Sequence, residues 1–322
     1  MKKLLIICGP TATGKTQVGV KLAQQFNGEI VSADSRQVYR GMDIATGKDL
    51  PVNFKFQISN FKFRNRRIGC YFWNNIPVWL LDVVSPRENF SVAGYHELAH
   101  QVITGIWQKD KLPILVGGTG LYIKAVTSGI DTLGVPPNRE LRQAYENKST
   151  VELLDILFHL DPEVVGRLNS SDRKNKVRLL RKIEIAQSDL PKKINSEWDN
   201  LDVIMIGLMA KPEILKVRIN SRVDQWIKEG LEKEVIKLLA NGVRWEDQAM
   251  SALGYREWRP YFEKKMSREA VIAKIKNGEW QYARRQMTWF KREKEIVWFD
   301  ISESNVEQRM VEKVEKWYNN TI

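Results

Sequence analysis

The sequence predicts an α/β fold with a mostly parallel sheet and an inserted helical subdomain. Three observations predict it: short apolar runs separated by helix-length segments, a glycine-rich turn between the first run and an amphipathic segment, and a long polar, helical stretch between the fourth and fifth runs. Alternating strands and helices are typical of a parallel sheet. The expected strands are Leu4–Cys8, Glu29–Ala33, Trp79–Val84, Ile114–Gly117, Val203–Leu208 and Ile296–Ile301.

The composition indicates a globular protein that attracts polyanions. The 322 residues are 43% hydrophobic and 28% charged, and 51 Lys and Arg against 39 Asp and Glu give a net charge of +12. Nucleic acid is the first candidate partner for such a field, and solubility alone is the other explanation. Two cysteines, Cys8 and Cys70, are too few for a disulfide framework, and we expect buried thiols. Because no stretch reaches membrane-spanning length, we expect a cytoplasmic protein with no membrane partner.

The first strand is followed by a phosphate-binding loop. The segment GPTATGKT fits the pattern of Gly, four residues, then Gly-Lys-Ser/Thr. Backbone N–H groups of such a loop surround a phosphate, Lys15 adds positive charge, and the Thr16 hydroxyl can hold Mg²⁺. The motif predicts a P-loop NTPase-like core and a di- or triphosphate ligand. The expected phosphate-binding residues are Gly9, Pro10, Thr11, Ala12, Thr13, Gly14, Lys15 and Thr16.

A helix should follow this loop, over about Thr16–Phe26. Val18, Leu22 and Phe26 recur four residues apart and form one apolar stripe. The loop therefore has both neighbours that a phosphate site of this kind requires.

The second strand ends at Asp34. In an open α/β sheet the carboxyl ends of the strands face the ligand crevice, so Asp34 should lie near the bound phosphate. A carboxylate there can accept a proton from an amine or hydroxyl nucleophile. A helix N-cap or a ligand in the Mg²⁺ shell explains an Asp at this position equally well.

Two later features could complete the crevice. The fourth strand is followed by a glycine-rich turn in which the backbone can approach a ligand and Thr119 offers a hydroxyl. Arg218 and Arg222 are four apart on an expected helix, so they share one face, where a guanidinium can clamp a pyrophosphate. Surface ion pairing is the alternative for these arginines.

Two insertions interrupt the expected core of residues 1–127 and 201–322. Residues 128–200 read as helical and polar. Residues 51–75 contain Phe54–Phe63 and Arg67–Trp73, which are typical of a basic β-hairpin.

The C-terminal hundred residues read as helical. They contain the run Trp280–Arg292, which mixes cations with aromatic rings. Such a run suits RNA binding or a core helix with a basic exposed face.

These segments together resemble the tRNA dimethylallyltransferases, also called tRNA isopentenyltransferases. The chain departs from the family pattern at about 51–75, where the family is commonly shorter, and at Ile76–Trp79, which stands in place of a pair of histidines. The matching segments come in the family's order: GPTATGKT at 9–16, SADSRQVYRGMDIATGK at 32–48, LLDVVSP at 80–86, PILVGGTGLY at 113–122, the segment with Arg178 and Arg181, SALGYRE at 251–257 and YARRQMTWFKR at 282–292.

The resemblance implies transfer of a dimethylallyl group from dimethylallyl diphosphate to N6 of the adenosine immediately 3′ of the tRNA anticodon, with Mg²⁺ assisting and pyrophosphate released. The phosphate loop would then hold an isoprenoid diphosphate, and we expect a monomer that binds the tRNA anticodon stem-loop. Asp34 matches the family's catalytic base, while Thr16, also the metal ligand, and Arg222 match catalytic groups on the diphosphate. Positions matching tRNA contacts are Asp34, Ser35, Arg36, Gln37, Thr119, Arg142, Val177, Arg178, Leu179, Leu180 and Arg181.

Three other functions fit parts of the pattern. An adenylate isopentenyltransferase would use free AMP, ADP or ATP, and the large insertion and the charge of +12 argue against so small an acceptor. A P-loop small-molecule kinase would phosphorylate its acceptor with ATP. A nucleic-acid-binding module with a vestigial loop would turn nothing over, and the intact Lys15, Thr16 and Asp34 argue against it.

Overall fold

The computed structural model describes residues 1–48, 55–64, 66–130, 134–189, 198 and 200–320. The chain divides into two compact units. Met1–Val126 together with Trp198–Ile322 form unit 1, and Thr127–Glu197 form unit 2.

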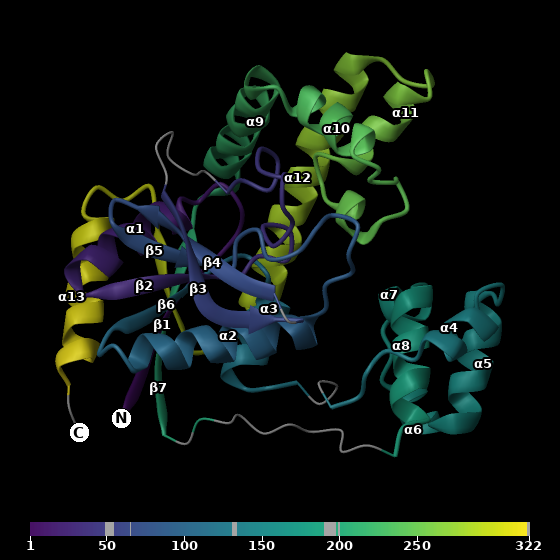
Figure 1. The fold of residues 1–322 in the computed structure, drawn as a ribbon, viewed down its shortest axis with the longest axis horizontal. Helices are drawn as coiled ribbons and strands as arrows, with labels where there is room; N and C mark the ends of the chain where they lie inside the picture. The colour runs from purple at the N-terminus through teal and green to yellow at the C-terminus, as the bar shows by residue number, and fades with distance from the viewer. Residues whose placement is uncertain (49–54, 65, 131–133, 190–197, 199, 321–322) are drawn as a thin grey trace. The chain divides into compact units, whose positions relative to one another are not determined.

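Within the described residues, unit 1 contains an eight-stranded sheet with the order β3-β4-β5-β2-β6-β1-β7-β8 (Figure 1). The strands are Lys2–Cys8 (β1), Gly28–Ser32 (β2), Lys55–Phe63 (β3), Arg66–Trp73 (β4), Ile76–Trp79 (β5), Leu112–Val116 (β6), Leu201–Met209 (β7) and Ile296–Asp300 (β8). Pairing is parallel from β5 through β8 in this order. The segment expected as a basic hairpin forms β3 and β4, and β4 pairs antiparallel with β3 and β5. The predicted α/β fold with a mostly parallel sheet is confirmed.

The predicted strand Trp79–Val84 is wrong in its bounds. β5 is Ile76–Trp79 and ends where the predicted strand begins. Leu80 and Asp82 have φ values of 66° and 54°, which belong to the left-handed region and are incompatible with a strand. Val84 therefore forms only an isolated parallel bridge, to Tyr39.

Helices cover both faces of the sheet (Figure 1). Because strand side chains alternate between faces, Leu4 and Ile6 of β1 enter one core, whereas Leu5 and Ile7 enter the other. The first core takes residues from α2 (Val92–Trp107), α3 (Gly120–Thr127), α9 (Pro212–Glu229), α10 (Leu231–Ala240) and α12 (Arg268–Phe290), and the second from α1 (Lys15–Gln25) and α13 (Val306–Asn319).

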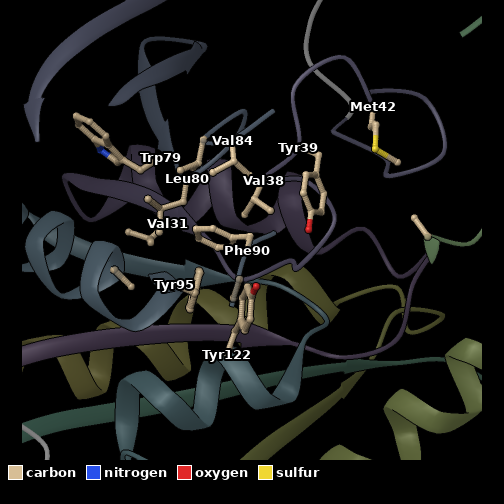
Figure 2. Close-up of a cluster of buried hydrophobic side chains, with 14 of the residues drawn as sticks. Val31, Val38, Tyr39, Met42, Trp79, Leu80, Val84, Phe90, Tyr95 and Tyr122 are labelled. Atoms are coloured by element: carbon tan, nitrogen blue, oxygen red, sulfur yellow. The ribbon is translucent and has the colours of Figure 1, made fainter. Parts of the chain in front are cut away.

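The first core continues beneath the loop that follows β2. Figure 2 shows Val38 and Tyr39 of this loop near Val84, among the buried side chains of one cluster. Tyr95 and Tyr122 stack in the same cluster with ring centroids 3.8 Å apart. This packing holds the loop that begins at Asp34.

Both cysteines are buried free thiols, as predicted. Burial raises the pKa of Cys8 to about 12 and that of Cys70 to about 11. At neutral pH both therefore stay protonated, which suits a packing role.

The remaining described helices fall into two groups. Unit 1 has α11 (Arg259–Phe262), with 3₁₀ turns at Gln248–Ser251 and Arg256–Trp258. Those of unit 2 are α4 (Arg139–Ala144), α5 (Thr150–Leu160), α6 (Pro162–Gly166), α7 (Ser170–Arg173) and α8 (Lys176–Ala186), which enclose a core of their own. Across the described ranges, no helix has the length and apolar character to span a membrane.

Candidate active site

A cavity of about 610 Å³ lies where β1, β2 and β6 end in unit 1. The phosphate loop, the Asp34–Gln37 segment and the turn at Gly117 and Gly118 follow these strands and line it, together with residues of α9 and α12. This is the position expected for a ligand in an open α/β sheet. Its charged lining side chains are Lys15, Arg36, Arg218, Arg222, Arg256 and Arg285, against Asp34 and Glu279. The excess of cations suits a polyanionic ligand.

The phosphate loop depends on its two glycines. Gly9 has φ 132°, and a Cβ atom there would lie 2.3 Å from the carbonyl oxygen of Leu208 in β7. Gly14 has φ 84° and precedes α1, whose N-terminus is capped by no side chain of the described residues. An uncapped helix N-terminus at the cavity is an anion-binding arrangement.

Lys15 and Thr16 both line the cavity. The Lys15 Nζ atom donates to the carbonyl oxygen of Pro10 at 2.7 Å, within its own loop. Thr13 donates to the same carbonyl at 2.9 Å and is 3% exposed. Thr13 therefore supports the loop, whereas Lys15 can exchange its carbonyl partner for a stronger, charge-assisted bond to a phosphate.

Arg218 and Arg222 reach the phosphate loop from α9. The Arg218 Nε atom donates to the carbonyl oxygen of Ala12 at 2.8 Å, and Arg222 Nη1 donates to Thr11 Oγ1 at 3.2 Å. The guanidinium of Arg222 also lies against Gly47, where a Cβ atom would be 1.9 Å from Nη2. Because the two arginines are four residues apart on α9, they lie on one face of the helix and both contact the loop.

Asp34 lies at the cavity wall and is held by its own loop. Its Oδ1 atom accepts hydrogen bonds from the backbone N–H groups of Arg36 at 2.8 Å and Gln37 at 3.4 Å. Gln37 in turn donates through Nε2 to the carbonyl oxygens of Thr46 and Gly47, at 3.2 and 2.9 Å. One segment therefore positions both the carboxylate and the glycine that receives Arg222.

Thr119 joins the turn after β6 to this segment. Its Oγ1 atom accepts a hydrogen bond from the backbone N–H group of Ser35 at 3.1 Å. Ser35, Arg36 and Gln37 line the cavity, and Arg36 Nη1 donates to the carbonyl oxygen of Gln248 at 3.0 Å.

Sequence reasoning assigned to the cavity none of the four α12 residues that line it: Glu279, Tyr282, Arg285 and Gln286. Two of them, Glu279 and Gln286, are buried polar residues. Both are 5% exposed and lie on the buried face of the helix. The sequence does contain a signal for these two residues. Each lies at helical spacing within a row of otherwise apolar residues: Val271, Ile275, Ala283 and Phe290.

Gln286 bridges two loops of the cavity. Its Oε1 atom accepts a hydrogen bond from the backbone N–H group of Thr11 at 2.8 Å, and its Nε2 atom donates to the carbonyl oxygen of Gly118 at 3.0 Å. A Cβ atom on Gly118 would lie 2.1 Å from that nitrogen. Gln286 is therefore a positioning residue for the phosphate loop.

We expect Gln286→Met to weaken binding of inorganic pyrophosphate about tenfold, measured by isothermal titration calorimetry. Methionine has a similar length but leaves the Thr11 N–H group and the Gly118 carbonyl without these partners, and each such loss costs about 1–3 kcal/mol. Phe290→Leu, on the same buried helix face, is the control that should change stability alone. Native pyrophosphate affinity in Gln286→Met would contradict the role.

Burial raises the pKa of Glu279 from an ordinary 4.5 to about 7. The positive charges of Arg222 and Arg285 oppose this rise, and the negative charges of Glu257 and Asp34 add to it. A large share of Glu279 is therefore protonated at neutral pH, in a cavity whose other lining acid is Asp34.

The stability contributed by Glu279 should fall as pH rises from about 4.5 to about 7. In this range the folded protein keeps the proton that the unfolded chain has released, so stability is highest below 4.5 and is lost on passing 7. The full effect is on the order of 3 kcal/mol. Urea unfolding should show Glu279→Gln, which does not titrate, gaining stability relative to the native protein between pH 5 and pH 8. A constant difference would rule out this titration.

The other predicted site residues lie in unit 2. Arg142 donates to both carboxylate oxygens of Glu184, at 2.6 and 3.1 Å, and Arg181 donates to Glu184 Oε2 at 2.9 Å. Burial opposes ionisation of Glu184, but the hydrogen bonds from the two arginines outweigh it and lower its pKa. Arg178 pairs with Asp172 at 2.8 Å. Each arginine is thus oriented by a carboxylate.

The apolar residues of the Val177–Arg181 segment differ in how exposed their side chains are. Val177 is 67% exposed, whereas Leu179 and Leu180 are buried in the core of unit 2. The two leucine side chains therefore support α8.

Comparison with known proteins identifies similar chains. Residues 37–293 match the family described as IPP transferase, and residues 2–68 match that described as isopentenyl transferase. The chain is 36% identical over 321 residues to a tRNA dimethylallyltransferase of Roseiflexus sp. (strain RS-1), covering 98% of this chain and 99% of the relative. It is 35% identical over 315 residues to that of Anoxybacillus flavithermus, with 97% and 95% covered.

Two solved structures are similar. One is the full-length tRNA isopentenylpyrophosphate transferase from Bacillus halodurans, with TM-score 0.69, 33% identity, and 98% of this chain and 97% of that chain covered. The other is a eukaryotic dimethylallyltransferase acting on tRNA, with TM-score 0.80 and 24% identity. The match covers 100% of this chain and 81% of that chain and shows a shared fold. The predicted P-loop NTPase-like core is confirmed.

Proposed function

Since this chain belongs to the tRNA dimethylallyltransferase family, we propose that its reaction takes place in the cavity of unit 1. The reaction transfers a dimethylallyl group from dimethylallyl diphosphate to N6 of the adenosine immediately 3′ of the tRNA anticodon and releases pyrophosphate. One observation supports the location most strongly: the cavity joins a phosphate loop with Arg222 on one side to the carboxylate of Asp34 on another.

The donor's diphosphate binds the phosphate loop. Backbone N–H groups of the loop surround it, apart from Pro10, which has none, and Thr11, whose N–H group donates to Gln286. The ammonium of Lys15 and the guanidinium of Arg222 complete the site. As the bond from C1 to oxygen breaks, its electron pair passes to the diphosphate, and the cations stabilise this added charge. The cations interact more strongly with the departing pyrophosphate than with the diphosphate of the intact donor. This difference lowers the activation barrier.

Thr16 would hold Mg²⁺ beside the diphosphate. Thr16 lines the cavity, and a hydroxyl is a hard oxygen donor that suits this ion. The described residues contain no cluster of three or more His, Cys, Asp or Glu that could form a dedicated metal cage, which fits an ion held mainly by phosphate oxygens and water. Bound Mg²⁺ supplies charge neutralisation on the leaving group.

Asp34 receives the proton from the acceptor. An adenine amine is a poor nucleophile, and the base must be flipped out of its stack to reach the cavity. The new bond joins N6 to C1 as the bond from C1 to the diphosphate oxygen breaks, and the N6 proton passes to the Asp34 carboxylate. Ser35, Arg36, Gln37 and Thr119 then lie beside the flipped nucleotide.

Unit 2 contributes to the grip on the anticodon stem-loop. Arg142, Arg178 and Arg181 offer cations to the RNA backbone, and Val177 is exposed beside them. Contacts of this kind position an RNA by its backbone and shape.

Incubation with Mg²⁺, labelled dimethylallyl diphosphate and unmodified tRNA with an adenosine 3′ of the anticodon tests the proposal, with AMP as the parallel acceptor. We expect label in tRNA alone and loss of transfer with EDTA. Label in AMP would move the protein to the adenylate isopentenyltransferases. Phosphorylation of an acceptor by ATP would identify a kinase.

A further inference from the structure

The hairpin of β3 and β4 forms one edge of the sheet and carries five cations. Of its described residues, Trp73 alone lines the cavity. Prenyl transfer in the cavity therefore gives the rest of the hairpin no role. The cations are Lys55, Lys62, Arg64, Arg66 and Arg67.

Two arginines at the tip are anchors. Arg66 Nη1 donates to Glu88 Oε1 at 2.7 Å, and Arg64 Nη1 lies 4.0 Å from Glu88 Oε2. Arg64 also donates to the carbonyl oxygen of Asn89 at 3.4 Å. The single carboxylate of Glu88 thus offsets one of these two positive charges and fixes the tip to the segment that follows β5.

The anchored tip connects to the cavity rim. Phe63 packs on Phe90 with ring centroids 5.4 Å apart, and the Phe90 N–H group donates to Gln248 Oε1 at 2.9 Å. The carbonyl oxygen of Gln248 accepts the hydrogen bond from cavity residue Arg36. The hairpin is thus joined to the cavity wall, and its own Trp73 lines the cavity that would receive the nucleotide.

Lys62 and Arg67 face each other directly across the two strands. Both are exposed, and neither has an ion-pair partner among the described residues. Like charges at opposed positions destabilise a hairpin. A polyanion that contacts both side chains would turn this repulsion into attraction.

Phe56 is opposite Tyr71, which lies four residues after Arg67 on β4, so alternation along β4 places Phe56 on the same face as this pair. A Cβ atom on Gly69 would be 2.4 Å from Phe56 Cζ, so the ring extends over the glycine. The ring of Tyr71 packs against that of Phe56, with ring centroids 4.9 Å apart. Phe56 is still 50% exposed, and neighbouring Ile58 is 63% exposed. An aromatic ring supported from below and open above is a platform on which a base can stack.

We propose that the face carrying Phe56, Lys62 and Arg67 binds the tRNA substrate, with the two cations on its phosphate backbone and Phe56 stacked on an unpaired base. The inference rests on the proposed function. Cations beside exposed aromatic rings on strands are typical of single-stranded RNA recognition. A second copy of the chain is disfavoured as the occupant because it would bring the same positive charges to this face.

Salt-dependent tRNA binding tests the two cations. In Lys62→Ala/Arg67→Ala we expect the slope of log affinity against log salt to become shallower by about 1.5, because two phosphate contacts are removed. The matched control is Lys313→Ala/Lys316→Ala, which removes the same charge from exposed positions of α13. The control should keep the native slope.

Substitutions of Phe56 test the platform. We expect Phe56→Leu to bind tRNA about fivefold more weakly or worse, since loss of a base stack costs about 1–3 kcal/mol. Phe56→Tyr, which keeps the ring, should restore affinity. KM for dimethylallyl diphosphate and the melting temperature should stay native in both variants.

If the native enzyme prenylates tRNA and these variants keep native tRNA affinity and salt slope, only the proposal that the hairpin binds tRNA is overturned. An unaltered enzyme that transfers nothing to tRNA would instead overturn the proposed function. A concentration-dependent dimer in sedimentation, lost in Phe56→Leu while tRNA affinity stays native, would assign the face to a second copy and also overturn the RNA contact.

Discussion

Asp34→Asn should lower kcat for tRNA prenylation by about 10²–10⁴-fold, the range for loss of a general base. The amide oxygen of Asn can still accept the hydrogen bonds from Arg36 and Gln37 that Asp34 Oδ1 accepts now. The loop should therefore keep its conformation while the acceptor for the N6 proton is lost. Single-turnover kinetics with saturating tRNA and dimethylallyl diphosphate measure the effect directly.

Binding measurements separate chemistry from structure in this variant. Pyrophosphate affinity and melting temperature should remain native in Asp34→Asn, whereas Asp34→Ala removes the acceptor for both backbone N–H groups and should disturb the loop as well. Native kcat in Asp34→Asn would show that the N6 proton leaves to another group, and Glu279 would then be the next carboxyl to replace.

Arg222→Ala should lower kcat/KM for the donor by about 10²–10³-fold, as expected when a donor to developing negative charge is removed. Arg222→Lys should recover little, because an ammonium lacks the planar fork that contacts a diphosphate at two oxygens. The measurement is steady-state prenylation with dimethylallyl diphosphate varied at saturating tRNA.

Gly47→Ala gives a second check on Arg222, although it also strains the backbone of this segment, because Gly47 has φ 61°. The added Cβ atom would lie 1.9 Å from Arg222 Nη2, so the guanidinium must move although its charge is retained. We expect a loss of kcat/KM in the same direction. Arg259→Ala removes a cation that is paired on the surface with Glu263 and should leave the kinetics unchanged. If Arg222→Ala behaves like Arg259→Ala, Arg222 does not bind the leaving group.

The two walls of the cavity differ in how they are held. The Asp34 wall, residues 34–47, is held by hydrogen bonds within the segment and by bonds to Thr119 and Gln248, and it packs on the core shown in Figure 2. The phosphate loop is held by residues of α9 and α12, through Arg218, Arg222 and Gln286. Changes on α12 should therefore act on donor binding before they act on proton transfer.

The sequence by itself predicted most of the sheet and two of the segments that line the cavity. Apolar runs alternating with helical periodicity report which faces are buried, and they located most strands to within a few residues. The phosphate loop could be predicted because its pattern lies within eight consecutive residues, between a strand and a helix. Asp34 could be predicted because strand ends in such a sheet converge on the ligand crevice.

Only the tertiary structure decided the partners of these residues. Gln286 meets Thr11 across 275 positions of the chain, and Arg222 meets Thr11 across 211. The left-handed turn at Leu80 ends β5 inside an apolar run. Glu88 pairs with two arginines at the hairpin tip, while Lys62 and Arg67 stay exposed. The periodicity of apolar residues predicts which side chains are buried and where local backbone hydrogen bonds form. Contacts between distant polar groups depend instead on how the helices and strands pack against one another.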